Sequence, residues 1–137
     1  MNSDIYSTEI IFYVANQEES YVFYKMLLGR EAELHVPGMT EFRLNTDLKF
    51  GIMPNKGIAN ILLPHTPHPQ LGYGIPRCEL YLSVENCDDW YQHAIDCGAK
   101  SISPPQDRNW GDRVAYCADP DGHILAFAQK DPGKTAL

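Results

Sequence analysis

A repeat with an offset of 70 residues is the feature that most constrains how this chain can fold. Tyr13–Asn16 lies 70 positions before Ser83–Asn86, and each tetrapeptide closes a stretch of alternating apolar residues. Each is followed by a segment of helical character and then by a glycine, Gly29 or Gly98. Strand, helix cap, helix and glycine recur in the same order. The sequence therefore predicts two modules built on one plan.

The first module is predicted to begin with a strand in which Ile10, Phe12 and Val14 form one apolar face. Asn16 is a preferred N-cap residue, so a helix is expected from there to Gly29. Turn residues separate the apolar segments that follow. These segments predict three short strands: Ala32–Val36, Glu41–Leu44 and Leu48–Met53.

The second module repeats the pattern, with a strand over Glu79–Val84 and a helix capped by Asn86 that runs through Cys97. A short strand, Lys100–Ser103, is expected to end at Pro104 and Pro105. Arg113–Ala118 and His123–Gln129 predict a hairpin across the turn at residues 119–122, with Ala115 opposite Ala126. In this register Arg113 and Ala126 share one face of the sheet.

Residues 55–77 separate the modules and are rich in proline and glycine, which predicts a connector without secondary structure. The expected architecture is a single α+β domain over residues 1–131, with βαβββ modules at about 8–54 and 78–129. A four-stranded sheet with one helix has only one face covered. We therefore expect the two modules to form a curved mixed sheet around a cavity. The tail from Lys130 to Leu137 is expected to be frayed.

The sequence resembles the vicinal oxygen chelate superfamily, which includes glyoxalase I, extradiol dioxygenases, fosfomycin-resistance enzymes and bleomycin-resistance proteins. The similarity is carried by Trp110–Tyr116 followed by Asp119–His123, which looks like the closing hairpin of that superfamily. Phe23-Tyr24 with Leu27–Gly29 is similar to its first-helix signature. This fold supports many activities, so the resemblance implies an architecture more strongly than a reaction.

The resemblance also implies four positions for metal ligands, one on the first and last strand of each module. Two of these positions fall on Glu9 and Glu79. The other two fall near Phe50 or Gly51 and on Ala126, where the side chains offer no ligand atom. Two carboxylates with water can bind Mg²⁺ or Ca²⁺ weakly but hold Zn²⁺, Ni²⁺ or Fe²⁺ poorly. We therefore expect no functional metal cofactor, and any weak divalent metal would be held by Glu9 and Glu79.

Five side chains are candidates for binding a ligand in the expected cavity. Carboxylates could attract a cationic group, aromatic rings could form walls, and an arginine could bind a ligand carboxylate. The alternative for the acids is a solvated rim or an ion pair with Arg43 or Arg113, and for the aromatics it is packing. The catalytic residues are unknown. The candidates are Glu9, Glu79, Tyr81, Trp110 and Arg113.

Composition excludes some partners. The chain has 11 basic and 18 acidic residues among 137, and no basic cluster longer than a pair, which argues against a nucleic-acid partner. No apolar run approaches 18 residues, and the first ten residues lack the features of a secretory signal. Four cysteines without a metal-binding spacing predict free thiols. We expect no membrane partner, a cytoplasmic location and, from the resemblance, a homodimer.

The sequence is compatible with three functions. The preferred one is metal-independent binding of a small organic ligand, cationic or aromatic, similar to bleomycin-resistance proteins. The second is a glyoxalase-type lyase or isomerase that uses Glu9 and Glu79 with a weakly bound divalent metal. The third is an interaction module that acts through its dimer surface.

Overall fold

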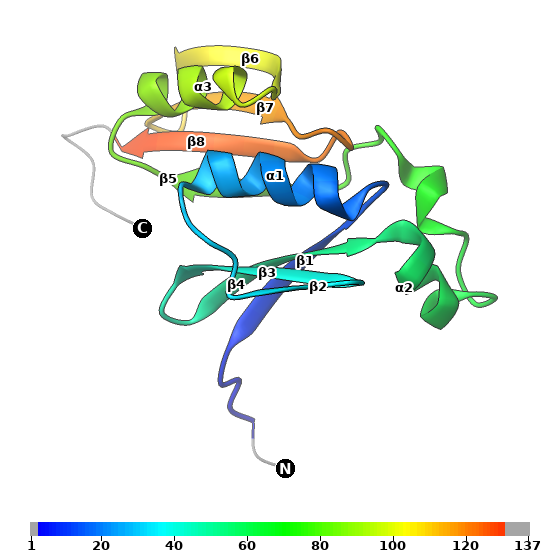
Figure 1. Cartoon of the computed structure of the whole chain (residues 1–137). Coiled ribbons are helices and arrows are strands. Elements are labelled where there is room, and N and C mark those ends of the chain that lie inside the picture. Colours follow the sequence, from blue (N-terminus) through cyan, green and yellow to red (C-terminus); the bar gives the residue numbers. More distant parts are fainter. Residues whose placement is uncertain (1–2, 131–137) are drawn as a thin grey trace. The chain divides into compact units, whose positions relative to one another are not determined.

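The computed structural model describes residues 3–130, which divide into two compact units on either side of the Tyr73–Gly74 bond. Of the tail predicted to be frayed, Lys130–Leu137, the structure places Lys130 at the end of a strand, and the rest lies outside the described residues. The elements of the first unit are β1 (Thr8–Val14), α1 (Gln17–Leu28), β2 (Leu34–Val36), β3 (Met39–Asn45), β4 (Leu48–Pro54), α2 (Asn55–Leu62) and the 3₁₀ helix η1 (Pro69–Gly72) (Figure 1). Those of the second are β5 (Glu79–Ser83), α3 (Cys87–Asp96), β6 (Lys100–Asp107), β7 (Asp112–Ala118) and β8 (Ile124–Lys130).

Each unit contains an open, mixed sheet of four strands. The strand order is β1-β4-β3-β2 in the first unit and β5-β8-β7-β6 in the second. In both sheets the first strand pairs in parallel with the last one, and the other pairs are antiparallel. The sequence prediction of an α+β fold with two tandem βαβββ modules is confirmed. None of the described helices is long and apolar enough to cross a membrane.

The helices α1 and α3 begin at the asparagines that the repeat predicts. The side chain of Asn16 accepts a hydrogen bond from the Glu19 backbone N–H, and Asn86 does the same for Asp89. Gly29 ends α1 with φ of 65°, in the left-handed region that glycine adopts without strain. The same local chemistry therefore fixes the start of the main helix in each module.

One face of each sheet packs against its helix. In the first unit the rings of Phe12 and Phe50 pack edge to face, with their centroids 5.0 Å apart. The ring centroid of Tyr24, in α1, lies 4.6 Å from that of Phe50. In the second unit the ring of Trp90, in α3, stacks on the ring of Phe127, with the two centroids 5.6 Å apart. Because side chains alternate along a strand, the neighbours of these buried residues point to the opposite, helix-free face of each sheet.

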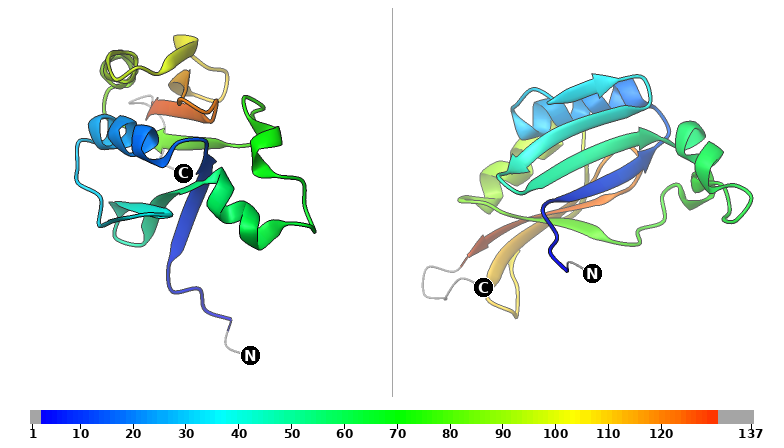
Figure 2. Two further views of the ribbon diagram at one scale, coloured as in Figure 1. Left: turned by 45° about the vertical axis from the view of Figure 1, so that its right-hand side comes forward. Right: turned by 90° about the horizontal axis from the view of Figure 1, so that it is seen from below.

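Two predictions about secondary structure are wrong. The stretch 55–77 is not a connector without elements, because it contains α2 and η1; Figure 2 shows α2 following directly from the end of β4. The strand from Lys100 does not stop at Pro104. It continues to Asp107, since β6 lies at the sheet edge and its register shifts between Ser101 and Gln106. An edge position with bulges is where a strand tolerates proline.

The capping hydrogen bonds give a first testable prediction. Replacing Asn16 or Asn86 with alanine should each lower the free energy of unfolding by about 1 kcal/mol, because a backbone N–H at the helix start loses its acceptor. Urea denaturation followed by circular dichroism measures the change. Asn60→Ala, an exposed residue inside α2, is the matched control and should cost much less. Equal losses in all three variants would contradict the assignment of the caps.

Candidate functional site

Two glutamates and a lysine meet on the helix-free face of the first sheet. In β1, Phe12 and Val14 are buried on the helix side, so Glu9 points to the other face. Glu9 forms a side-chain hydrogen bond with Glu41 of β3. The Nζ atom of Lys49, in β4, lies 3.5 Å from Oε1 of Glu41. The Oε2 atom of Glu9 is buried and has no hydrogen-bond partner, as expected for a carboxyl that is partly desolvated.

This environment changes the acidity of Glu9. Burial, and then the hydrogen bond and negative charge of Glu41, raise the pKa of Glu9 from 4.5 to about 7, while the Lys49 charge opposes the rise. Carboxyl groups that share a proton titrate as a pair, because both cannot ionise freely at short range. The first sheet therefore presents a carboxyl pair that can accept or release a proton near neutral pH.

The sequence identified Glu9 but not its neighbour Glu41. It paired Glu9 with Glu79, which belongs to the other unit; that pairing stays a prediction. Glu41 and Arg43 are two positions apart in β3 and therefore lie on the same face of the sheet. The strand order β1-β4-β3 was needed to place this face of β3 near Glu9. Arg43 itself forms an ion pair of 2.7 Å with Glu33 rather than with Glu9.

The helix-free face of the second sheet presents aromatic side chains held by a buried carboxylate. The hydroxyl of Tyr81 donates a hydrogen bond of 2.7 Å to Oδ2 of Asp112, and the indole N–H of Trp110 donates one of 3.0 Å to the Tyr81 hydroxyl. Burial and Asp112 hold the pKa of Tyr81 at about 12, so its hydroxyl stays neutral. The predicted ligand-binding residues Tyr81 and Trp110 are thus brought together, and Asp112 is an anchor that the sequence analysis missed.

Tyr116 extends the same surface. It pairs across the ladder with Ala126, which also pairs with Tyr81 on the other side, so both tyrosines flank one fully buried alanine. The Arg108 guanidinium lies 5.2 Å from the centre of the Tyr116 ring. Burial and then the negative charge of Glu79 raise the pKa of Tyr116. The exposed Glu79 carboxylate therefore acts on this aromatic face.

We call Tyr81, Trp110, Tyr116 and Asp112 the aromatic face. Trp110 is 54% exposed and Tyr81 is 38% exposed, whereas Asp112 is buried. The Nζ atom of Lys130 lies 3.6 Å from Asp112 Oδ2 and compensates part of its charge. Large aromatic side chains that are exposed yet fixed by hydrogen bonds are suited to stack against a ligand.

The predicted position of Arg113 on this face is wrong. Ala115 pairs with Phe127 and not with Ala126, so the hairpin register differs by one residue from the predicted one. A shift of one residue moves every side chain to the other face. Arg113 consequently points to the helix side, where its guanidinium lies 2.9 Å from Asp88 and 3.3 Å from Asp107. Its predicted role in ligand binding stays untested, and these two carboxylates already satisfy much of its charge.

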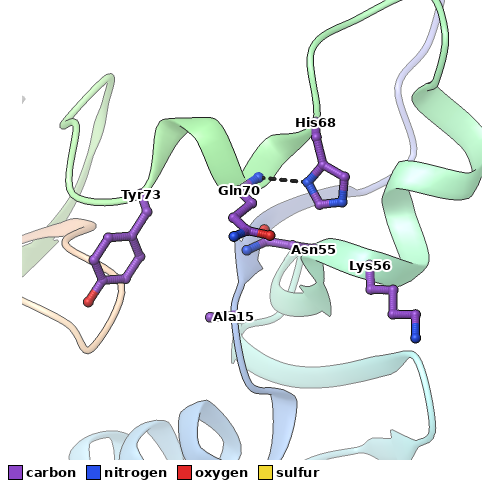
Figure 3. Close-up of a pocket in the computed structure, with 6 residues that line it drawn as sticks. All are labelled: Ala15, Asn55, Lys56, His68, Gln70 and Tyr73. Atoms are coloured by element: carbon purple, nitrogen blue, oxygen red, sulfur yellow. Dashed lines mark hydrogen bonds between the residues drawn. The ribbon is translucent and has the colours of Figure 1, made fainter.

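The first unit also contains a pocket of about 660 Å³ at the start of α2 (Figure 3). His68, from the proline-rich stretch 55–77, lines this pocket. Its Nδ1 atom accepts a hydrogen bond of 3.1 Å from the backbone N–H of Gln70. No local pattern in the proline-rich stretch around His68 indicates that it lines a pocket.

Comparison with known proteins agrees with this architecture. The sequence model of the glyoxalase-like domain matches residues 7–130. The chain belongs to the glyoxalase-like domain family. Among solved structures, this glyoxalase-like chain is similar to a glyoxalase-related enzyme from Fulvimarina pelagi, with a TM-score of 0.78 and 17% identity over 94% of this chain and 89% of the other. At that identity the similarity shows the fold alone.

Two further comparisons place the glyoxalase-like chain among its relatives. A protein from Agrobacterium tumefaciens whose structure was solved by NMR in solution is 27% identical, with a TM-score of 0.72 and coverage of 93% of this chain and 98% of the other. Uncharacterised proteins of Mycobacterium bovis and Mycobacterium tuberculosis are 30% identical over 80 residues, which is 58% of this chain and 52% and 46% of theirs. The chain spans about half the length of these curated relatives.

The residues of this glyoxalase-like chain do not fit the metal site that the superfamily implies. Gly51 has no donor, and a Cβ atom there would lie 2.5 Å from Oε2 of Glu9, so the Glu9 carboxylate already fills the space beside it. Ala126 is fully buried and has no donor either. Glu9 and Glu79 alone do not provide the three or four protein ligands that hold a transition metal. This chain therefore lacks two of the four donors that the implied metal site requires.

A different set of possible ligand atoms lies in the β7–β8 turn. Among residues 3–130, one group of three carboxylate or imidazole side chains has its ligand atoms within 4.8 Å of one another: Asp119, Asp121 and His123. The Asp119 carboxylate accepts hydrogen bonds from two backbone N–H groups of the turn and contacts His123 Nδ1 at 2.9 Å. These hydrogen bonds stabilise the tight turn between β7 and β8, which explains why the three side chains lie close together.

The Glu9 pair gives a prediction about pH and stability. A carboxyl whose pKa is raised on folding adds stability that is fully present below pH 4.5 and is lost as the pH rises to about 7. The free energy of unfolding of Glu9→Gln should therefore be close to that of the wild type at pH 4. At pH 8 it should exceed the wild-type value by about 1–3 kcal/mol. Urea titrations across this range measure the difference.

The control is Glu85→Gln, which makes the same change of net charge at an exposed position. If the difference between Glu9→Gln and wild type were as large at pH 4 as at pH 8, or followed the Glu85→Gln curve, Glu9 would not be the buried group described above.

Proposed function

We propose that this protein binds a small organic ligand, aromatic or cationic, on the aromatic face of its second unit and without a metal ion. The observation that carries the proposal is the chain of hydrogen bonds from Trp110 to Tyr81 to Asp112. It fixes two exposed rings before any ligand arrives, so the ligand does not have to order them.

The chemistry of the aromatic face favours a flat or positively charged ligand. A ring can stack on Trp110 or Tyr81, and a cation is attracted to their π faces. Such contacts supply about 0.5–2 kcal/mol each. The carboxylate of Glu79, which acts electrostatically on Tyr116, adds attraction for a positive charge. An anionic ligand would meet repulsion from the same group.

The empty donor positions support binding over metal-dependent catalysis. Gly51 and Ala126 cannot ligate, and the Glu9 carboxyl is engaged with Glu41 rather than available as a charged ligand. A fold that lacks half of the implied ligand set but presents an aromatic surface is suited to hold a molecule without a metal, as the resemblance to bleomycin-resistance proteins implies. The expected homodimer and cytoplasmic location stay predictions.

A second candidate function is a lyase or isomerase, and one observation favours it. A pKa of about 7 is close to the best value for a general acid or base at neutral pH, and Glu9 has it. In this reading the Glu9–Glu41 pair would take a proton from a substrate and return it. The part that Glu79 was predicted to play beside Glu9 in this function stays a prediction. The glyoxalase-related neighbour from Fulvimarina pelagi is described as an enzyme, which agrees with this alternative.

The two tryptophans allow a direct test of ligand binding. In ¹⁵N NMR spectra the indole signal of Trp110 should shift on titration with benzyltrimethylammonium, because that N–H is held at the aromatic face. The indole of Trp90, which stacks on Phe127 beneath α3, is the internal control and should not move. Benzyl alcohol should bind more weakly because it lacks the positive charge, and benzoate should bind most weakly because it is negatively charged.

Two variants sharpen this experiment. Asp112→Asn keeps a hydrogen-bond acceptor for Tyr81 and should retain most binding, whereas Tyr81→Phe removes the acceptor for the Trp110 N–H and should weaken binding by about threefold to tenfold. Equal binding of all three probes, or shifts of Trp90 as large as those of Trp110, would argue against an aromatic, cation-selective site.

Calorimetry tests the absence of a functional metal. Titration with Ni²⁺, Zn²⁺, Mn²⁺ and Mg²⁺ should give no stoichiometric binding tighter than about millimolar, because two of the four ligand positions lack donors. Glu9→Gln is the matched variant. Tight binding at one ion per chain that this variant abolishes would overturn the metal-independent proposal and favour the lyase.

A further inference from the structure

The pocket in the first unit is built where β1 ends, α2 begins and η1 passes nearby. It has a volume of about 660 Å³, within the range of small-molecule sites. Figure 3 shows the Lys56 and Tyr73 side chains on opposite sides of it, with Ala15 between them. All of the lining residues belong to one unit: Ala15, Asn55, Lys56, His68, Gln70 and Tyr73.

The N-terminus of α2 lacks the capping and acidic side chains that satisfy the free backbone N–H groups at the N-termini of α1 and α3. Its N-cap residue is Pro54, no side chain accepts a hydrogen bond from the first turn, and that turn contains no acidic residue. By contrast, α1 and α3 each have an asparagine cap and two acidic residues in the first turn. The backbone N–H groups at the start of a helix attract negative oxygen atoms when nothing else satisfies them.

A buried polar atom of the pocket also lacks a partner. Asn55 is 8% exposed, and its Oδ1 atom is buried without a hydrogen bond. Leaving a buried carbonyl oxygen without a hydrogen bond is unfavourable, so such groups rarely lack a donor. The Asn55 side chain lines the pocket and extends towards its η1 side (Figure 3). A bound molecule with a hydrogen-bond donor would satisfy it.

The pocket lining contains a lysine and no acidic residue, in an otherwise acidic protein. The chain carries a net charge of −7, yet residues 50–73 contain no aspartate or glutamate and include Lys56 and two histidines. Lys56 lines the pocket. Because Nδ1 of His68 accepts the Gln70 backbone N–H, the proton of the neutral ring resides on Nε2, which can donate to a ligand.

We propose that this pocket binds a small hydroxylated anion, whose charged oxygens face the start of α2 and Lys56 and whose hydroxyl donates to Oδ1 of Asn55. A hydroxycarboxylate and a phosphate ester with a hydroxyl share this chemistry. The pocket shares no residue with the aromatic face, so this second binding site goes beyond the proposed function and stands or falls independently of it.

NMR titration of the whole chain tests the proposal with four probes at constant ionic strength: glycolate, acetate, glycerol 3-phosphate and ethyl phosphate. Glycolate and glycerol 3-phosphate should cause saturable shifts of the backbone amides of residues 55–57 and 68–70. Acetate and ethyl phosphate lack the hydroxyl and should each bind about threefold to tenfold more weakly than their partners. The tighter of the two hydroxylated probes identifies carboxylate or phosphate as the preferred anion.

Two variants assign the roles of the pocket residues. Lys56→Gln should weaken both hydroxylated anions about threefold to tenfold. Lys25→Gln, on α1 and outside the pocket lining, makes the same change of net charge and should have less than about a twofold effect. Asn55→Ala should bring glycolate and acetate to equal affinity, with the amide spectrum of the second unit confirming that the variant is folded.

The proposal is overturned if neither hydroxylated anion gives saturable shifts at these amides. It is also overturned if Lys56→Gln and Lys25→Gln weaken binding equally, because binding would then follow net charge alone. Equal affinity of glycolate and acetate in the wild-type protein would overturn it as well, because the pocket would then not recognise the hydroxyl that is proposed to donate to Asn55.

Discussion

Strand register is the constraint on which the rest of this structure depends. Each unit covers one face of a four-stranded sheet with a helix, and the alternation of side chains then decides what the other face presents. In β1, burial of Phe12 and Val14 against the helix leaves Glu9 on the helix-free face. In β7, the pairing of Tyr116 with Ala126 puts Tyr116 on the aromatic face and sends Arg113 to the helix side. A single step of register would exchange these roles.

The two modules share a plan and differ in chemistry on equivalent faces. The first places a carboxyl pair there, Glu9 with Glu41, whose burial raises one pKa to about 7. The second places tyrosine and tryptophan there, ordered by the buried carboxylate of Asp112. The backbone frame is set by apolar packing and helix caps, which leaves the helix-free positions able to vary without disturbing the fold. The two helix-free faces thus differ in chemistry although the modules share one architecture.

The departures from the expected secondary structure have local causes. Proline and glycine in residues 55–77 suggested a connector, but the short apolar run with Ile58 and Ala59 buries itself as α2. Pro104 and Pro105 suggested the end of a strand, but β6 pairs on one side only and accommodates them with shifts of register. In both cases the tertiary setting outweighs the local preference of single residues.

The sequence by itself determined the two modules, the caps at Asn16 and Asn86, the glycine that ends α1 and the family to which the chain belongs. These depend on residues close together in the chain, whose hydrogen bonds and backbone angles are local. It also offered Glu9 as a candidate through the resemblance to the superfamily, and Tyr81 and Trp110 as candidate walls of a binding site. Only the tertiary structure decided that Glu9 meets Glu41, that Asp112 anchors Tyr81, and that Asn55 and His68 line one pocket. Those contacts join residues 13 to 32 positions apart, and sheet order and register, which no local pattern encodes, bring them together.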